Sequence, residues 1–446
     1  MRDDANEKIL KHIDIFNSIR CAFIAAVIFS GATAPTACAS DDGESPTFKL
    51  RGFGTLGGVH SNAKNADFTH GPFEPNGAGY TRSWAMGVDT KLGVQADARF
   101  SDKFSAVLQL VSKHQYNNSY EPSVEWANLK YQFTPDFDIR VGRTVTTPFM
   151  VSDSRLVGYA NLWIRPPQEV YGLLPFINKD GVDVNYRFGV GEAMNMVHLS
   201  YGEISPKLPN SGTAKVKNSI SLANTLDYGP ITLRASYSRA RVDLHTPETD
   251  ALFEGLTQFG NTLSAIPGFA SIGSQSLNLS NKYRFENALI SFFSFSASYD
   301  RDQWLLMAEL AHFNGYSFLA KSTAWYATAG YRIGKFTPYM TVAQLSPEKQ
   351  SEAEIPVTAL AVIPSLAAGA AALNDGINRT LTAGAFGQKS LAVGVRWDFM
   401  KNIAFKAQYD YMMLDSTSSG RLGNVQPNFQ PGGKVSAVGI ALDFIF

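Results

Sequence analysis

The sequence predicts an all-β fold, a transmembrane antiparallel β-barrel. Three observations support this prediction: long runs in which apolar and polar residues alternate, gaps between the runs that alternate in length, and a composition rich in aromatic residues but poor in charge. Charged residues are 17% of the 446 positions, aromatic residues 12% and hydrophobic residues 45%. Soluble globular chains have about 25% charged residues, and a mean hydropathy of −0.10 is too low for a bundle of membrane-spanning helices.

The N-terminal segment has the order of a secretory signal. A basic region precedes the apolar run 21–30, and the small-residue triplet 37–39 follows it. The run is too short for a transmembrane helix, which needs about 20 residues. We therefore expect a signal peptide at 1–39 and an outer-membrane barrel at 40–446.

Both cysteines, Cys21 and Cys38, fall inside the expected signal peptide. The mature chain would then contain no disulfide, no thiolate metal site and no cysteine nucleophile. The alternative is a lipoprotein signal that ends at Cys38, although Pro35 stands where such signals carry leucine.

Alternation is clearest over 86–100, where the even positions from Met86 to Phe100 are apolar or small. Most odd positions from 89 to 99 are polar or charged, and segments 182–188, 391–399 and 403–411 repeat the pattern. A period of two predicts strands with one apolar face.

About sixteen segments can be assigned as strands. They lie at 48–60, 84–100, 104–113, 124–133, 137–143, 182–188, 195–201, 218–228, 231–240, 287–299, 304–312, 323–332, 336–344, 390–399, 403–412 and 435–446. Short and long gaps alternate between them, which predicts short periplasmic turns at one end of a barrel and long extracellular loops at the other. The alternative is a soluble propeller or β-helix, but the repeated sequence unit of such folds is missing.

The segment 355–374 has no charged residue and could be read as a transmembrane helix. It is mostly alanine, contains Pro356 and Pro364, and lies in a long gap between strands. We interpret it as a short helix or a packed insertion in an external loop.

The chain ends VSAVGIALDFIF, in which Leu442, Phe444 and Phe446 share one apolar face. A last strand that ends in Phe resembles the assembly signal of bacterial outer-membrane barrels. Further matching pieces are FKLRGFGTLG at 48–57, DIRVGR at 138–143, DGVDVNYRF at 180–188 and SLAVGVRWDF at 390–399. Over 48–446 the chain therefore resembles the Gram-negative porins of the sixteen-stranded, trimeric kind.

This resemblance implies a homotrimer in the bacterial outer membrane whose third long gap, 144–181, folds into the pore. It also implies that acidic loop residues, here Asp153 and Glu169, face a basic strip on the wall. Inward parity assigns to that strip Lys91, Arg99, Lys130, Arg140 and Arg187. Arg143 shares the parity of Val141, so an inward position for it requires a bend at Gly142.

Catalytic and metal-binding chemistry finds little support in the sequence. None of the six histidines after position 39 forms an H-x-x-x-H pair. His60, Ser61 and Asn62 are the only suggestive cluster, and chance proximity at a strand end explains them better. We expect no enzyme activity, cofactor or metal, and the balance of 39 basic and 39 acidic residues gives no sign of a nucleic-acid partner.

Three functions remain open. The first is a porin for passive diffusion of small hydrophilic solutes and ions across the outer membrane, with membrane lipid as its surroundings. The second is a channel selective for one substrate class, such as sugars or organic anions. The third is an enzyme or adhesin that uses the barrel as a scaffold. The sequence leaves the natural solute, ion preference and pore diameter undetermined.

Overall fold

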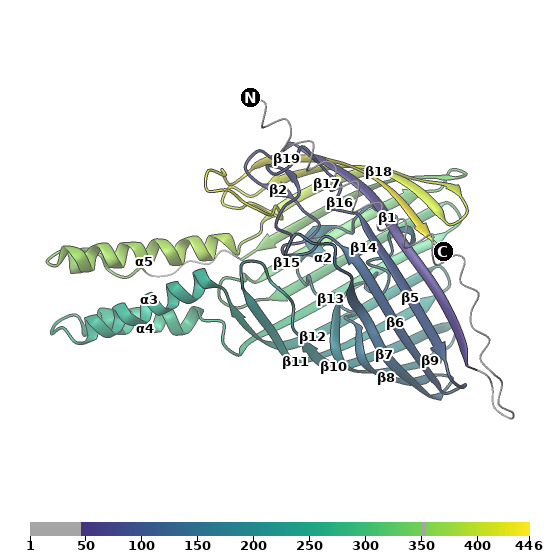
Figure 1. Ribbon diagram of the computed structural model, residues 1–446, viewed down its shortest axis with the longest axis horizontal. Helices are drawn as coiled ribbons and strands as arrows, with labels where there is room; N and C mark the ends of the chain where they lie inside the picture. Colours follow the sequence, from purple (N-terminus) through teal and green to yellow (C-terminus); the bar gives the residue numbers. More distant parts are fainter. Residues whose placement is uncertain (1–45, 349–353) are drawn as a thin grey trace. The chain divides into compact units, whose positions relative to one another are not determined.

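The computed structural model describes residues 46–348 and 354–446, so the expected signal peptide lies outside the described residues. Within these residues, sixteen long strands form a closed antiparallel barrel (Figure 1). They are β1 (Thr47–Ser61), β5 (Lys91–Arg99), β6 (Phe104–Lys113), β7 (Ser123–Thr134), β8 (Phe137–Val145), β9 (Asn178–Val190), β10 (Ala193–Ile204), β11 (Thr213–Tyr228), β12 (Ile231–His245), β13 (Ala288–Arg301), β14 (Trp304–Asn314), β15 (Ser322–Tyr331), β16 (Phe336–Pro347), β17 (Gln388–Met400), β18 (Ile403–Leu414) and β19 (Gly433–Ile445).

Each long strand pairs with its neighbours in sequence, and the pairing of β1 with β19 closes the barrel. The predicted fold class is thereby confirmed. Closure leaves no unpaired sheet edge. An unpaired edge would be unfavourable in a lipid bilayer, because no water is present there to satisfy its backbone groups.

The predicted strand at 84–100 is wrong in its first half. Residues 84–85 form the short strand β4 (Trp84–Ala85), and the ladder of β5 starts only at Lys91. Between them Asp89 turns its carboxylate to the guanidinium of Arg165 in the barrel interior. The ion pair lies within 86–90, the part of the predicted strand that is absent from the ladder. Two further short strands, β2 (Asp67–Phe68) and β3 (Ala78–Gly79), pair with each other in the preceding loop.

Side chains alternate between the two faces of the wall, as β15 illustrates. Ser322, Ala324, Tyr326 and Thr328 are buried inside, whereas the residues between them are exposed on the outer face. The outer face is broadly apolar, and pairs of aromatic rings line it near the short turns. Examples are Trp304 with Tyr331 and Phe336 with Trp397, whose ring centroids lie 4.9 Å and 5.5 Å apart. An apolar band edged by aromatic residues is the surface that a bilayer requires.

The two longest loops contain helices that extend away from one end of the barrel (Figure 1). These are α3 (Pro247–Ser264) and α4 (Ala270–Tyr283) in one loop and α5 (Pro364–Ala383) in another. They share an apolar core that includes Leu256, Leu279 and Ile377. Of the two interpretations of 355–374, a short helix or a packed insertion, the structure shows a helix, which begins at Pro364 and continues to Ala383. Among the described residues no helix is long and apolar enough to cross a membrane.

The helices α3 and α4 were not predicted, although one signal for α3 was available. Thr246 and Thr249 form a reciprocal capping box, and Pro247 occupies the first helical turn. This combination is typical of a helix N-terminus.

The C-terminal residues close the barrel against β1. The backbone N–H of Phe446 donates to the carbonyl of Gly52 at 2.9 Å, and the N–H of Gly52 donates back to Phe446 at 2.8 Å. The rings of Phe444 and Phe446 stack on the outer face with centroids 6.4 Å apart, and Phe446 is 58% exposed. Leu442 pairs in register with Leu56 on the same face.

We predict that Phe446→Asp lowers the amount of barrel assembled in the outer membrane far more than it changes the conductance of assembled molecules. The substitution places a carboxylate in the outward aromatic region, where the apolar side chain contributes to membrane contact. The measurement is heat-modifiable mobility of the membrane fraction on gels. Val425→Asp, at an exposed loop residue, is the matched control, and normal levels of the Phe446 variant would contradict the prediction.

Candidate functional site

The loop between β8 and β9, residues 146–177, folds back into the barrel, and we call it the inner loop. It contains a short 3-10 turn at Gly158–Ala160 and one turn of helix, α2 (Gln168–Tyr171). Its first residues are fixed to the wall by strand side chains. Arg234 donates to the carbonyl of Thr147 at 2.8 Å, and Ser236 donates to that of Pro148 at 2.9 Å.

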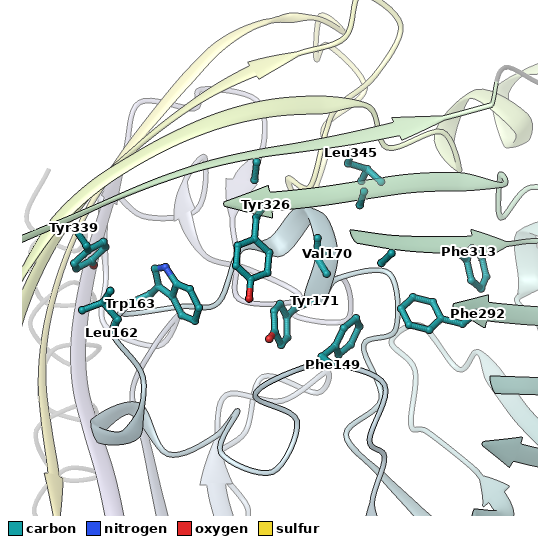
Figure 2. Close-up of a cluster of buried hydrophobic side chains, with 13 residues drawn as sticks. Phe149, Leu162, Trp163, Val170, Tyr171, Phe292, Phe313, Tyr326, Tyr339 and Leu345 are labelled. Carbon is teal, nitrogen blue, oxygen red and sulfur yellow. The ribbon is translucent and has the colours of Figure 1, made fainter. Parts of the chain in front are cut away.

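An apolar cluster attaches the middle of the inner loop to strands β13 and β15 of the wall. Phe149, Trp163 and Tyr171 of the loop are at most 1% exposed and pack against Phe292 and Tyr326 of the strands. Figure 2 shows the loop rings and the strand rings pointing toward one another. The indole N–H of Trp163 also donates to the hydroxyls of Thr328 and Thr341 at 3.1 Å and 2.9 Å. Burial of several aromatic rings, with the indole N–H of Trp163 satisfied, holds the loop firmly.

A buried lysine anchors the part of the loop between these rings. Lys406 of β18 is 0% exposed, and its ammonium donates to the carbonyls of Gly158, Asn161 and Trp163 at 2.8, 2.7 and 2.8 Å. Its Nζ lies 2.8 Å from Oδ2 of Asp443 in β19. All three donors of the ammonium are thus directed to the loop, and the carboxylate compensates its charge.

A second cluster of charged residues fixes the inner loop at Arg165, two residues after Trp163. The guanidinium of Arg165 pairs with Asp89 and, at 3.0 Å, with Asp410 of β18. Arg165 is 4% exposed. The loop is therefore held to β18 at two levels, by Lys406 and by Asp410.

The inner loop leaves a cavity of about 610 Å³ between itself and the short turns, the turn-side cavity. Its lining carries seven basic and four acidic residues: Lys49, Arg51, Arg99, Lys130, Arg140, Arg187, Arg234, Asp97, Asp138, Asp153 and Asp183. Some of these charges pair locally, as Arg51 does with Asp97 at 2.8 Å and Arg140 with Asp138 at 3.3 Å. Asp153, on the inner loop, forms no ion pair with any residue that the structure describes, so its charge faces the cavity.

Five of the seven residues assigned to a constriction line this cavity together: Asp153, Arg99, Lys130, Arg140 and Arg187. The other two lie elsewhere. Glu169 is 3% exposed, and its carboxylate accepts from Gln388 of β17 at 2.7 Å. Lys91 is 7% exposed and does not line the turn-side cavity. The fold of the inner loop decides the position of Glu169, because α2 turns it toward the wall.

Lys49, Arg51 and Arg234 also line the cavity but were not assigned from the sequence. Lys49 and Arg51 have the same parity in β1 as Thr55, whose hydroxyl donates to Asp443 in the interior at 2.6 Å. Parity alone could have found them.

Arg143 lines a cavity on the long-loop side of the inner loop, and the backbone just before it has the unusual conformation that an inward position needs. Gly142 has φ +123°, a conformation that favours glycine. After this bend Arg143 forms a two-pronged ion pair with Asp180 at 2.8 Å and 2.7 Å. Val141, two residues earlier in β8, is 55% exposed on the outer face.

Two further cavities lie on the other side of the inner loop, near the long loops. One, of about 420 Å³, is lined by many polar residues, including Glu74, Arg143, Arg155 and Arg421. Burial raises the pKa of Glu74 to about 8, although its carboxylate accepts from the backbone N–H of His70 at 2.7 Å. A pKa of about 8 favours the neutral form of Glu74 at pH 7, whereas Arg155 and Arg421 stay charged, because burial lowers their pKa only to about 10.

The third cavity, of about 280 Å³, is lined mainly by apolar side chains from the inner loop and from β11 to β14. It shares Phe73, Phe176, Phe386 and Arg421 with the polar cavity beside it. We call it the apolar cavity.

The suggestive cluster at the end of β1 is not assembled as a catalytic site. Nδ1 of His60 lies 2.7 Å from the carbonyl of Ser83, and its ring packs on Trp84 at 5.4 Å between centroids. Within 46–348 and 354–446, no group of three or more His, Cys, Asp or Glu residues is arranged to hold a metal ion.

Comparison with known structures addresses the fold. The outer-membrane channel DcaP of Acinetobacter baumannii matches 92% of this chain and 100% of its own, with a TM-score of 0.52 at 11% identity. The chain has the fold of an outer-membrane porin. Salmonella typhi OmpF, in a complex with daunomycin, matches at a TM-score of 0.49 with 13% identity, 90% of this chain and 97% of that one.

A variant of the porin from Rh. blastica matches at a TM-score of 0.45, with 13% identity and coverage of 90% of this chain and 100% of that one. No protein-family profile matches the sequence, and no curated protein does. The resemblance to the porin fold is thus one of structure, with little shared sequence.

We predict that Lys406→Met releases the inner loop and lowers the free energy of unfolding by about 3–5 kcal/mol, the usual effect of removing one partner of a buried ion pair. Three loop carbonyls would lose their donor, and Asp443 would lose the positive charge that compensates its own. Unfolding by guanidinium chloride in detergent micelles measures the change in the free energy of unfolding. Lys401→Met, in an exposed turn, is the control, and equal stability of the two variants would show that Lys406 does not anchor the loop.

Proposed function

We propose that this protein is a passive channel for small hydrophilic solutes and ions in the bacterial outer membrane. The observation that carries the proposal is the turn-side cavity, because a closed barrel encloses it and charged side chains of both signs line it. A barrel used only as a scaffold has no need of a charged interior narrowed by an ordered loop. Such a lining is typical of pores that pass hydrated ions.

The charges of the turn-side cavity favour anions. Its lining has seven basic residues against four acidic ones, a formal excess of three positive charges. At an effective dielectric constant of about 20, two charges 4 Å apart interact by about 4 kcal/mol. The interaction across a hydrated pore is weaker, but about 1.4 kcal/mol already corresponds to a tenfold preference.

Bilayer recordings test the proposed function directly. We expect the purified protein to form steps of ion conductance in a planar lipid bilayer and a reversal potential in a KCl gradient that indicates anion preference. A protein that inserts but does not conduct would overturn the proposal in favour of the scaffold functions. The homotrimer implied by the resemblance stays a prediction, which crosslinking in membranes can test.

We predict opposite shifts of reversal potential for two sets of charge variants. Arg140→Ala combined with Arg187→Ala removes positive charge from the turn-side cavity and shifts selectivity toward cations. Asp153→Asn removes a loop carboxylate without an ion-pair partner among the described residues and shifts selectivity toward anions. The readout is the reversal potential of single channels in a KCl gradient.

Val141→Ala is the control for these variants, because Val141 lies on the outer face. It should leave reversal potential and conductance as in the wild type. If both sets of charge variants also leave them unchanged, the turn-side cavity is not the selective part of the pore.

A further inference from the structure

The apolar cavity combines a hydrocarbon wall with a half-buried cation at its edge, Arg421, whereas the other arginine of its lining, Arg239, is exposed. The wall is formed by Leu173 and Phe176 of the inner loop and by Val216, Val242 and Phe292 of the strands. Phe176 is stacked on Phe73 of the first long loop, with ring centroids 5.7 Å apart and planes 16° from parallel. The surface is therefore apolar and in part aromatic, and it lies inside a barrel whose other cavities are lined by charges.

The cation is Arg421, from the loop between β18 and β19, and it lines both the apolar and the polar cavity. Its guanidinium carbon lies 5.1 Å from the centroid of Phe386, which supports the charge from one side. Gly172 lets it approach the inner loop closely, because a Cβ at Gly172 would lie 3.1 Å from that carbon.

The guanidinium of Arg421 has no ion pair and no side-chain hydrogen bond to any residue of 46–348 or 354–446, and its Nε is fully buried. Glu169 is the acidic residue whose charge acts on Arg421, but its carboxylate accepts a hydrogen bond from Gln388 and forms none with the arginine. Gln388 in turn accepts from the backbone N–H of Arg421 at 2.7 Å, so this network positions the arginine without neutralising it.

Arg421 is half-buried, and its Nε is buried without a partner, so a planar anion at the guanidinium would supply the missing acceptor. Carboxylates match the guanidinium fork with two parallel hydrogen bonds. The apolar wall beside it would remove the hydrocarbon part of such a ligand from water, which favours binding. Neither feature suits a sugar, which would leave its hydroxyl groups unsatisfied against the wall.

We propose that this site binds an amphiphilic monocarboxylate, with the carboxylate on Arg421 and an aromatic or short aliphatic body in the apolar cavity. The apolar cavity has a volume of about 280 Å³. Pockets for drug-sized ligands have volumes of about 300–1,000 Å³, so the ligand of this cavity is small. The proposal rests on the channel function and specifies a solute class that the channel binds on the loop side of the inner loop.

Isothermal titration calorimetry on the folded protein in detergent micelles tests the site without requiring conduction. The probe is 3-phenylpropanoate, with empty micelles as the blank. We expect saturable binding, and binding at least tenfold weaker for propanoate, which lacks the ring, and for 3-phenylpropan-1-ol, which lacks the charge. Absence of saturable binding at millimolar probe, or equal affinity for the alcohol, would overturn the proposal.

Arg421→Gln should weaken binding of 3-phenylpropanoate about tenfold or more, because hydrogen bonds to a charged group are lost. Phe176→Ala should weaken binding of 3-phenylpropanoate but leave that of propanoate unchanged. Arg379→Gln, on the exposed face of α5, is the matched control and should bind as the wild type does. Wild-type affinity in the first two variants, with heat-modifiable mobility intact, would place the ligand elsewhere.

Bilayer recordings separate this proposal from the channel function. If the protein conducts but does not bind the probe, the carboxylate site is wrong and the channel function stands. If it binds the probe with the dependence on Arg421 described above but does not conduct, the site stands as a binding site and the channel function is wrong. Should Arg421→Gln fail to fold, Arg421→Lys, which keeps the charge but loses the two-pronged geometry, is expected to bind several-fold more weakly than the wild type.

Discussion

The interior of this barrel depends on one buried interaction, the ammonium of Lys406 bonded to three carbonyls of the inner loop and compensated by Asp443. A loop inside a barrel has backbone groups that neither lipid nor a neighbouring strand can satisfy. A lysine directed inward from β18 satisfies three of them at once, and its charge is acceptable only because β19 supplies a carboxylate. The aromatic cluster around Trp163 and Tyr326 then packs on a loop whose path is already fixed.

The position of the inner loop divides the interior into compartments of different chemistry. Toward the short turns the wall carries an excess of positive charge around the exposed carboxylate of Asp153. Toward the long loops, an apolar cavity lies next to a polar one, and Arg421 borders both. A solute that enters from the loop side therefore meets a hydrocarbon surface and a cation before it reaches the charged compartment. This order favours anions that carry some apolar surface over neutral polar solutes.

The alternation of side chains in the sequence predicted all sixteen long strands, because strand parity depends only on neighbouring residues and on which face meets lipid. The prediction failed at 86–90, which lie outside the ladder between β4 and β5. This segment contains Asp89, whose partner Arg165 lies 76 positions away in sequence. The two helices of the longest loop were likewise missed, although α3 has a capping box at Thr246 and apolar residues at helical spacing, Phe253, Leu256 and Leu263. α4 has no side-chain cap at its N-terminus, and its signal in the sequence is weaker.

By itself the sequence determined the strand ladder and the parity that places Arg99, Lys130, Arg140 and Arg187 inside, since both follow from local geometry. Only the tertiary structure decided which charges meet across the interior. Asp153 and Glu169 lie sixteen positions apart in the same loop, yet one faces the turn-side cavity and the other is buried against Gln388. The role of Arg421 was equally hidden, because its environment is assembled from the inner loop, the first long loop and the end of α5, segments far apart in sequence. Contacts between distant segments have no local signature, and for that reason parity could place side chains inside the barrel without saying what each would meet there.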